Sequence, residues 1–127
     1  MVASSFAEVP ARLAAALEGE HPLFIYRGDT KAWRWRLWAD DQRTVPYDLS
    51  GVTGVAAQIR RSPDDLRKTD LACEVELPNV IVMHLHAQAS ASCPSGRWDL
   101  QLTWPDGRVL TAIKGPVYVE PDVTRHE

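Results

Sequence analysis

The stretch Lys31–Asp41 reads KAWRWRLWADD and carries three tryptophans and two arginines within six consecutive residues. Apolar and mostly charged side chains alternate along it, and this period of two is typical of a β-strand with one buried face. A stacking platform for nucleic acid or sugar would need the tryptophans exposed together in a basic groove. We therefore predict that one set packs in a core, while Trp38, on the arginine face, is an interface anchor. The core set is Trp33, Trp35 and Leu37, and the outer set is Arg34, Arg36 and Trp38.

The same alternation recurs along the chain after Pro22, in short segments separated by turn residues. Pro105–Gly107 is a strong hairpin signal, and Ala87–Ser92 has the small residues of one helical turn. Seven or eight short strands without βαβ alternation indicate an antiparallel sandwich or barrel. We predict an all-β fold, an antiparallel β-sandwich of the immunoglobulin-like or jelly-roll-like kind. The expected strands, besides the one above, are Leu23–Tyr26, Val52–Arg60, Leu71–Leu77, Val80–His86, Trp98–Trp104, Arg108–Lys114 and Val117–Glu120.

An apolar stripe of helical period precedes these strands, from Ser5 to Glu18. Pro10 is tolerated in a first helical turn, and Gly19 is a plausible end. We therefore divide the chain into an N-terminal amphipathic helix or arm, residues 1–20, and a β-sandwich domain, residues 21–127. The helix either folds back over a sheet edge or docks on a neighbouring subunit, because a short amphipathic helix is marginal alone. Its predicted interface residues are Phe6, Val9, Leu13 and Leu17.

Length and charge limit the partners that we expect. The 127 residues suit one domain, and the net charge of −3 lacks the basic surplus that nucleic-acid binding usually needs. No apolar run approaches the roughly 20 residues that cross a bilayer, so we expect neither nucleic acid nor membrane as a partner. We expect no secretory leader, because Glu8 and Arg12 interrupt the N-terminal apolar residues. Cys73 and Cys93 are then predicted to be reduced thiols.

Signals for catalysis are few. The sequence has no Gly-rich phosphate loop, no G-x-S-x-G, no H-E-x-x-H and no C-x-x-C. His84 and His86 share one face of a predicted strand, but a zinc or iron site needs a third ligand, such as Cys73 or Glu74, that no spacing specifies. We predict a protein that is not an enzyme and that holds no metal and no cofactor.

Several short motifs follow one another in a characteristic order. They are residues 24–30 (FIYRGDT), residues 45–51 (VPYDLSG) leading into a strand that ends at residues 58–60 (QIR), residues 98–101 (WDLQ), residues 115–119 (GPVYV) and residues 122–125 (DVTR). In this order they resemble the β-sandwich domain of tailed-phage virion proteins, namely baseplate upper proteins and long-tail-fibre (minor tail) proteins. The resemblance spans about residues 22–125.

The resemblance implies a non-enzymatic structural protein at the tail tip, baseplate or fibre attachment site of a phage virion. It implies other virion proteins as partners, a symmetric homo-oligomer, threefold or sixfold, and synthesis in the cytoplasm of a bacterial host. Because no shaft repeat or second domain follows the match, we expect a small adaptor or accessory subunit.

Two alternatives stay open at this point. A carbohydrate- or host-surface-binding module is the first, since sandwiches present aromatic residues to sugars and Trp38 is available. A cupin-like metal enzyme that uses His84 and His86 is the second.

Overall fold

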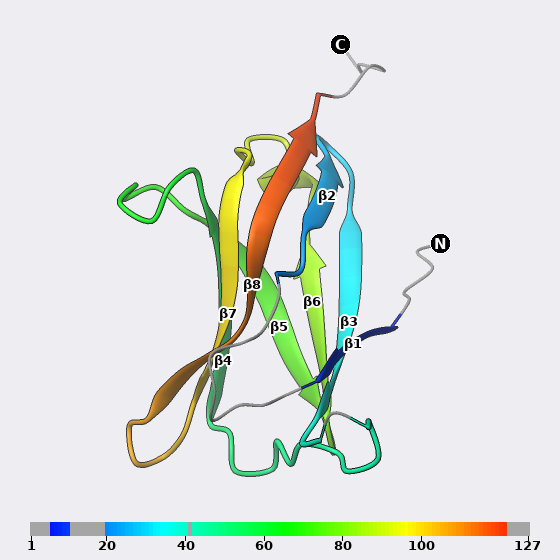
Figure 1. Cartoon of the computed structure of the whole chain (residues 1–127). Helices are drawn as coiled ribbons and strands as arrows, with labels where there is room; N and C mark the ends of the chain where they lie inside the picture. Colours follow the sequence, from blue (N-terminus) through cyan, green and yellow to red (C-terminus); the bar gives the residue numbers. More distant parts are fainter. Residues whose placement is uncertain (1–5, 11–19, 41, 122–127) are drawn as a thin grey trace.

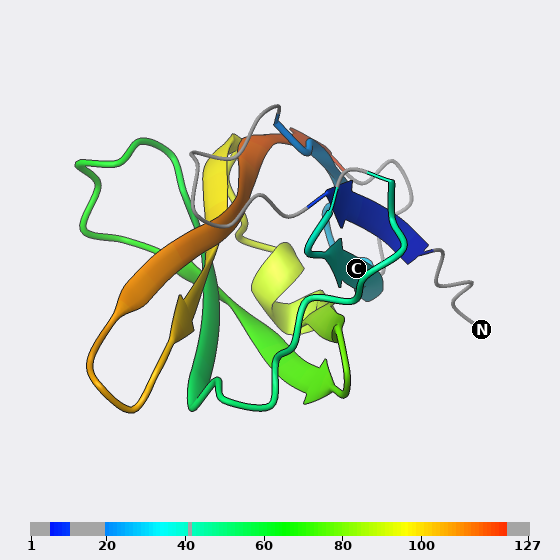
Figure 2. The ribbon, with the colours of Figure 1, turned by 60° about the horizontal axis from the view of Figure 1, so that its bottom comes forward.

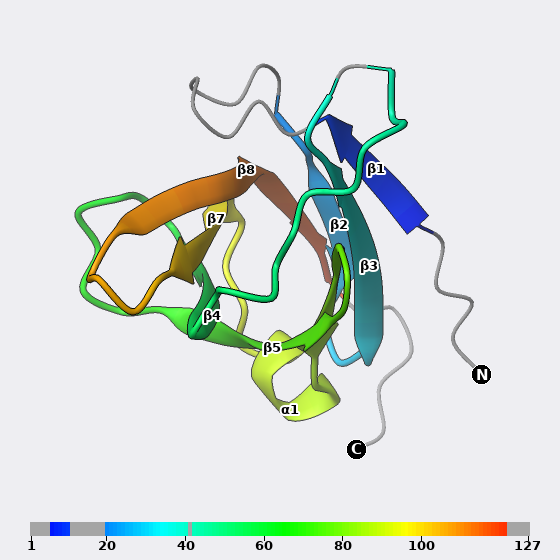
Figure 3. The same ribbon diagram turned by 90° about the horizontal axis from the view of Figure 1, so that it is seen from below.

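The computed structural model of the chain describes residues 6–10, 20–40 and 42–121. Figure 1 shows the strands wrapped around a common interior, and Figure 3 shows one short helix beside them. The elements are β1 (Phe6–Pro10), β2 (Leu23–Tyr26), β3 (Lys31–Trp38), β4 (Gly54–Arg60), β5 (Thr69–Glu76), β6 (Val80–Leu85), α1 (Ala87–Ser90), β7 (Gly96–Thr103) and β8 (Val109–Glu120). The last two strands predicted from the sequence are thus one long strand, β8.

The eight strands form a single mixed sheet in the order β1-β3-β6-β5-β4-β7-β8-β2, which curls into a nearly closed barrel (Figure 3). The pairs β1–β3 and β2–β8 are parallel, and the other neighbours are antiparallel. The all-β prediction is confirmed. The strands do not separate into two antiparallel sheets, however, because β5 pairs with β4 through Thr69–Leu71 and with β6 through Ala72–Glu76. Strand β5 therefore continues the hydrogen bonding of the sheet from β6 to β4.

The N-terminal helix prediction is wrong for the residues that the structure describes there. Phe6–Pro10 form β1, which lies parallel to β3, with Phe6 opposite Arg34 and Pro10 opposite Trp38. The edge of β3 offers unpaired backbone groups, and pairing with them outweighs a weak local helical preference. Proline is compatible with an edge strand. The rest of the predicted helix, including Leu13 and Leu17, lies outside the described residues.

The core confirms the alternation predicted for the tryptophan-rich strand. Trp35 and Leu37 point inward and are buried, with 3% and 0% of their surfaces exposed, and Trp33 packs partly buried against the same cluster. The Trp35 and Trp98 rings stack with centroids 5.4 Å apart. Arg34 points outward and pairs with Glu76 of β5. The strand is therefore structural on its tryptophan face.

Two turns between strands contain a glycine with a positive φ value. Gly28 and Gly107 adopt positive φ values of 87° and 89°, which glycine tolerates at no steric cost. Gly107 lies in the predicted hairpin turn between β7 and β8, where its N–H donates to the carbonyl of Trp104. The loop of residues 61–68, between β4 and β5, projects from the barrel (Figures 1 and 2). Pro63 of this loop lines a groove on the outside of the sheet.

Candidate functional site

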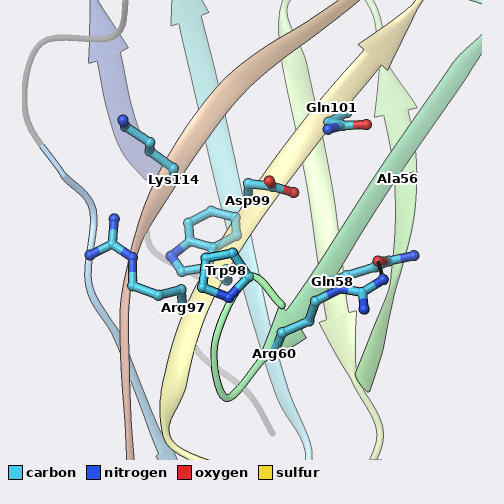
Figure 4. Close-up of a pocket in the computed structure, with 9 residues that line it drawn as sticks. Ala56, Gln58, Arg60, Arg97, Trp98, Asp99, Gln101 and Lys114 are labelled. Carbon is cyan, nitrogen blue, oxygen red and sulfur yellow. Dashed lines mark hydrogen bonds between the residues drawn. The ribbon is translucent and has the colours of Figure 1, made fainter. Parts of the chain in front are cut away.

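A polar groove of about 530 Å³ lies on the outer surface of β4, β7 and β8 (Figure 4). Its polar side chains face outward because they alternate with buried core residues such as Ile59 and Leu100. Cross-strand pairing joins them into rows: Asp99 lies opposite Gln58 on β4 and opposite Lys114 on β8. The lining residues are Ala56, Gln58, Arg60, Pro63, Arg97, Trp98, Asp99, Gln101 and Lys114.

Two arginines of the groove are held in place by their neighbours. The Arg60 guanidinium donates from Nη2 to Oε1 of Gln58 at 3.1 Å, and from Nη1 to the backbone carbonyl of Asp65. Arg97 forms an ion pair with Glu20, and this hydrogen-bonded guanidinium lowers the pKa of the Glu20 carboxyl. Both guanidinium groups are thus positioned before any ligand arrives.

Asp99 and Lys114 differ from the arginines. Within the described part of the chain, neither side chain makes a hydrogen bond or an ion pair, although they lie on directly opposed strand positions. Partial burial raises the pKa of Asp99, and the positive charge of Arg60 opposes this shift. The groove therefore contains a partly desolvated carboxylate that lacks donors, beside an exposed ammonium group that makes no direct ion pair and contributes to lowering the pKa of Glu20.

The histidines and cysteines form no comparable site. The described residues contain no group of three or more His, Cys, Asp or Glu side chains that could hold a metal ion, so His84 and His86 are not joined there by a third ligand. Cys73 and Cys93 are free thiols in the structure. Burial raises the pKa of Cys73 to about 11 and also raises the pKa of Cys93.

Among the predicted interface residues, Phe6 and Val9 lie on β1, and Trp38 lies at the end of β3. None of these strands contributes to the groove. Trp38 is partly buried, and its indole nitrogen is buried without a hydrogen-bond partner in the described part of the chain. The polar atom of this ring is therefore not presented to a ligand.

Sequence reasoning missed an exposed aromatic pair. Phe24 on β2 lies opposite Tyr118 on β8, and the rings stack with centroids 5.4 Å apart. Their exposed fractions are 59% and 52%, and Tyr26, on the same strand face as Phe24, is also exposed. Strand alternation alone could have placed these rings outside the core. Their meeting depends on the parallel pairing of two segments from opposite ends of the domain.

No protein-family model matches the chain, and the search of curated proteins finds no match to it. None of the helices in the described part is long and apolar enough to cross a membrane. Fold and site together define an all-β domain that presents a polar groove and a stacked aromatic pair on the outer faces of neighbouring strands.

Proposed function

We propose that the protein is a non-enzymatic structural component of a tailed-phage virion, a small adaptor or accessory subunit of the tail tip, baseplate or fibre attachment site. The observation that carries the proposal is the Phe24–Tyr118 pair. Phe24 belongs to the motif FIYRGDT and Tyr118 to the motif GPVYV, two of the segments that resemble phage β-domains. Exposed aromatic side chains are enriched at protein–protein interfaces, so this pair suits contact with a neighbouring subunit.

Other residues of the same motifs have architectural positions that support the proposal. Leu49 is buried in the core, and Asp48 accepts a hydrogen bond from the N–H of Ser50 at 2.8 Å. The Trp98 indole donates to the carbonyl of His21 at 2.8 Å. Residues that shape loops and core contacts suit a structural part better than a reaction site.

The partners that fit this role are other virion proteins and further copies of the chain in a threefold or sixfold assembly. Closed symmetric assemblies are common among oligomers, and a tail axis favours these symmetries. The protein would be made in the cytoplasm of the bacterial host and then incorporated into the particle.

The test is the composition of particles from the phage that encodes the chain. An epitope tag on the protein should label one end of the tail in negative-stain images, and quantitative mass spectrometry should give a copy number divisible by three. The double variant Phe24→Ser, Tyr118→Ser should fold but be incorporated poorly. Leu66→Ser is the matched control, because Leu66 is 92% exposed in the loop between β4 and β5. Purified particles that lack the protein would refute the role.

A carbohydrate- or host-surface-binding module is the second candidate. The groove favours it, because Gln58, Asp99 and Gln101 supply planar polar groups that can bond to neighbouring hydroxyls. A glycan array probed with the purified protein tests this candidate, and an array without signal above a denatured control would exclude it.

A further inference from the structure

The groove over β4, β7 and β8 combines a partly buried carboxylate, Asp99, with an exposed ammonium group, Lys114, that makes no direct ion pair among the described residues. Few ligands suit both groups. We propose that it binds an acidic sugar, a saccharide unit with a carboxylate beside vicinal hydroxyl groups, such as a uronic acid. This inference goes beyond the structural role proposed above and specifies the ligand of the second candidate function.

The cationic side of the groove suits a carboxylate. Lys114 has no acceptor of its own among the described residues, while Arg60 and Arg97 are already fixed by Gln58 and Glu20. Hydrogen bonds between a cation and a carboxylate are stronger than those between neutral groups. Because the guanidinium groups are positioned in advance, little side-chain entropy is lost when the ligand binds.

Asp99 determines what else the ligand must carry. It lies in the middle of the groove, between Lys114 on one side and Gln58 and Gln101 on the other (Figure 4). A partly buried carboxylate without donors is costly, and ligand hydroxyls would supply the missing hydrogen bonds. The side-chain amides of the two glutamines can donate to one hydroxyl and accept from another.

The same carboxylate disfavours the simpler ligands. Inorganic phosphate and anions without hydroxyl groups bring mainly acceptors, so Asp99 would repel them without gaining a full set of donors. A neutral sugar would satisfy Asp99 but offer Lys114 no carboxylate to bind directly. An apolar molecule would leave both groups desolvated and unpaired.

Calorimetric titration of the full chain with a galacturonate oligomer tests the proposal. Two probes separate the requirements: a galactose oligomer of equal length, which lacks the carboxylate, and propane-1,2,3-tricarboxylate, which lacks hydroxyls. We expect the galacturonate oligomer to bind at least about tenfold more tightly than either probe, which is the scale of one lost hydrogen bond to a charged group.

The decisive variant is Lys114→Gln, and the matched control is Lys68→Gln. Lys68 is an exposed lysine outside the groove that donates to Asp70 at 3.1 Å. Lys114→Gln should weaken galacturonate binding about tenfold or more and abolish the preference over the neutral oligomer, while Lys68→Gln should change affinity less than about twofold. Circular dichroism should show both variants folded.

Several outcomes would overturn the proposal. They are no galacturonate binding at millimolar concentration, equal binding of the tricarboxylate, or an equal loss in Lys68→Gln, which would indicate general attraction of anions. A Lys114→Gln variant that is less stable and binds as before would instead mean that Lys114 pairs with Asp99. Incorporation of Lys114→Gln into particles is measured separately, so the structural role and the sugar site can fail independently.

Discussion

At the scale of single residues, Trp35 links the sequence pattern to stability. Its ring is buried in the interior of the curled sheet and stacks on Trp98, with a further edge contact to His21 at 5.8 Å between centroids. Its indole N–H is buried without a partner among the described residues. The ring therefore contributes through packing rather than through hydrogen bonding.

Trp35→Ala should lower the free energy of unfolding by about 3–5 kcal/mol, the usual cost of emptying a buried aromatic site. Trp35→Phe should cost clearly less, because it keeps an aromatic ring and breaks no hydrogen bond. Arg34→Ala should cost about 1 kcal/mol or less, since its ion pair with Glu76 is partly exposed. Urea denaturation measures all three, and a variant order with Arg34→Ala as the most damaging would contradict the assigned strand face.

Asp99 should make stability depend on pH in an unusual direction. Its pKa is raised in the folded state, so the folded protein holds this proton more tightly than the unfolded chain does. The contribution of Asp99 to stability is thus lost as the pH rises from its ordinary pKa of 3.8 through the raised value. Asp99→Asn should therefore raise the Tm at pH 7 and give no gain near pH 3.

The lowered pKa values of carboxyls such as Asp40 and Asp65 make stability change with pH in the opposite direction. These groups are present in both the parent protein and the Asp99→Asn variant, so their effects cancel when the two Tm values are compared. Asp70→Asn is the control, because Asp70 is exposed and pairs with Lys68. A Tm difference for Asp99→Asn that is the same at both pH values would contradict the desolvation argument.

At the scale of elements, close approach of backbones decides where glycine is required. A Cβ added to Gly115 of β8 would lie 2.3 Å from the carbonyl oxygen of His21, whose N–H bonds back to Lys114 at 2.9 Å. A Cβ at Gly51 would meet only the Trp104 side chain, at 3.8 Å. At Gly115 the segment before β2 packs directly against the backbone of β8, whereas Gly51 has room for an added methyl group.

Gly115→Ala should therefore destabilise the protein by about 1–3 kcal/mol or more, because the backbone of the segment before β2 must move. Gly51→Ala should stay within about 0.5 kcal/mol of the parent. Thermal unfolding followed by circular dichroism compares the two variants. Equal Tm values would mean that β2 does not depend on this close contact.

The edge strand β1 should protect the sheet rather than create it. Deleting residues 1–10 leaves β3 with its antiparallel ladder to β6, so we expect a folded, β-rich protein. The deletion also exposes the edge of β3 at Arg34–Trp38, and an open edge promotes association with other chains. Light scattering should show concentration-dependent assembly that deletion of residues 1–5 does not cause. Global unfolding of the shorter chain would instead place β1 within the cooperative core.

At the scale of the whole molecule, the two thiols should report unfolding. Cys93 is fully buried. Cys73 has a pKa of about 11, so only about one in a thousand of these thiols is in the reactive thiolate form at pH 8. Ellman's reagent should react slowly with the native protein and should count two thiols after denaturation. A reductant should leave the Tm unchanged, because both cysteines are free. Rapid stoichiometric labelling of the native protein would contradict this burial.

Local pattern in the sequence was enough to predict most strands, the hairpin turn at Gly107 and the inward face of Trp35 and Leu37. Each of these depends on neighbours a few residues apart, whose alternation or turn chemistry is visible in the chain. The helical stripe from Phe6 to Leu17 shows the limit of this reasoning. The same spacing that suits a helix was overridden at Phe6–Pro10 by an available sheet edge.

The sequence by itself determined that the protein is all-β. A strand with one buried face needs apolar and polar residues in alternation, whatever its position in the sheet, so the pattern is visible in the sequence. Only the tertiary structure decided that β5 turns the ladder into one curled sheet, that Asp99 meets Gln58 and Lys114, and that Phe24 stacks on Tyr118. These contacts join segments far apart in the chain, and their register follows from how all the strands close around one core. The candidate site lies at such contacts, so no local motif could have predicted it.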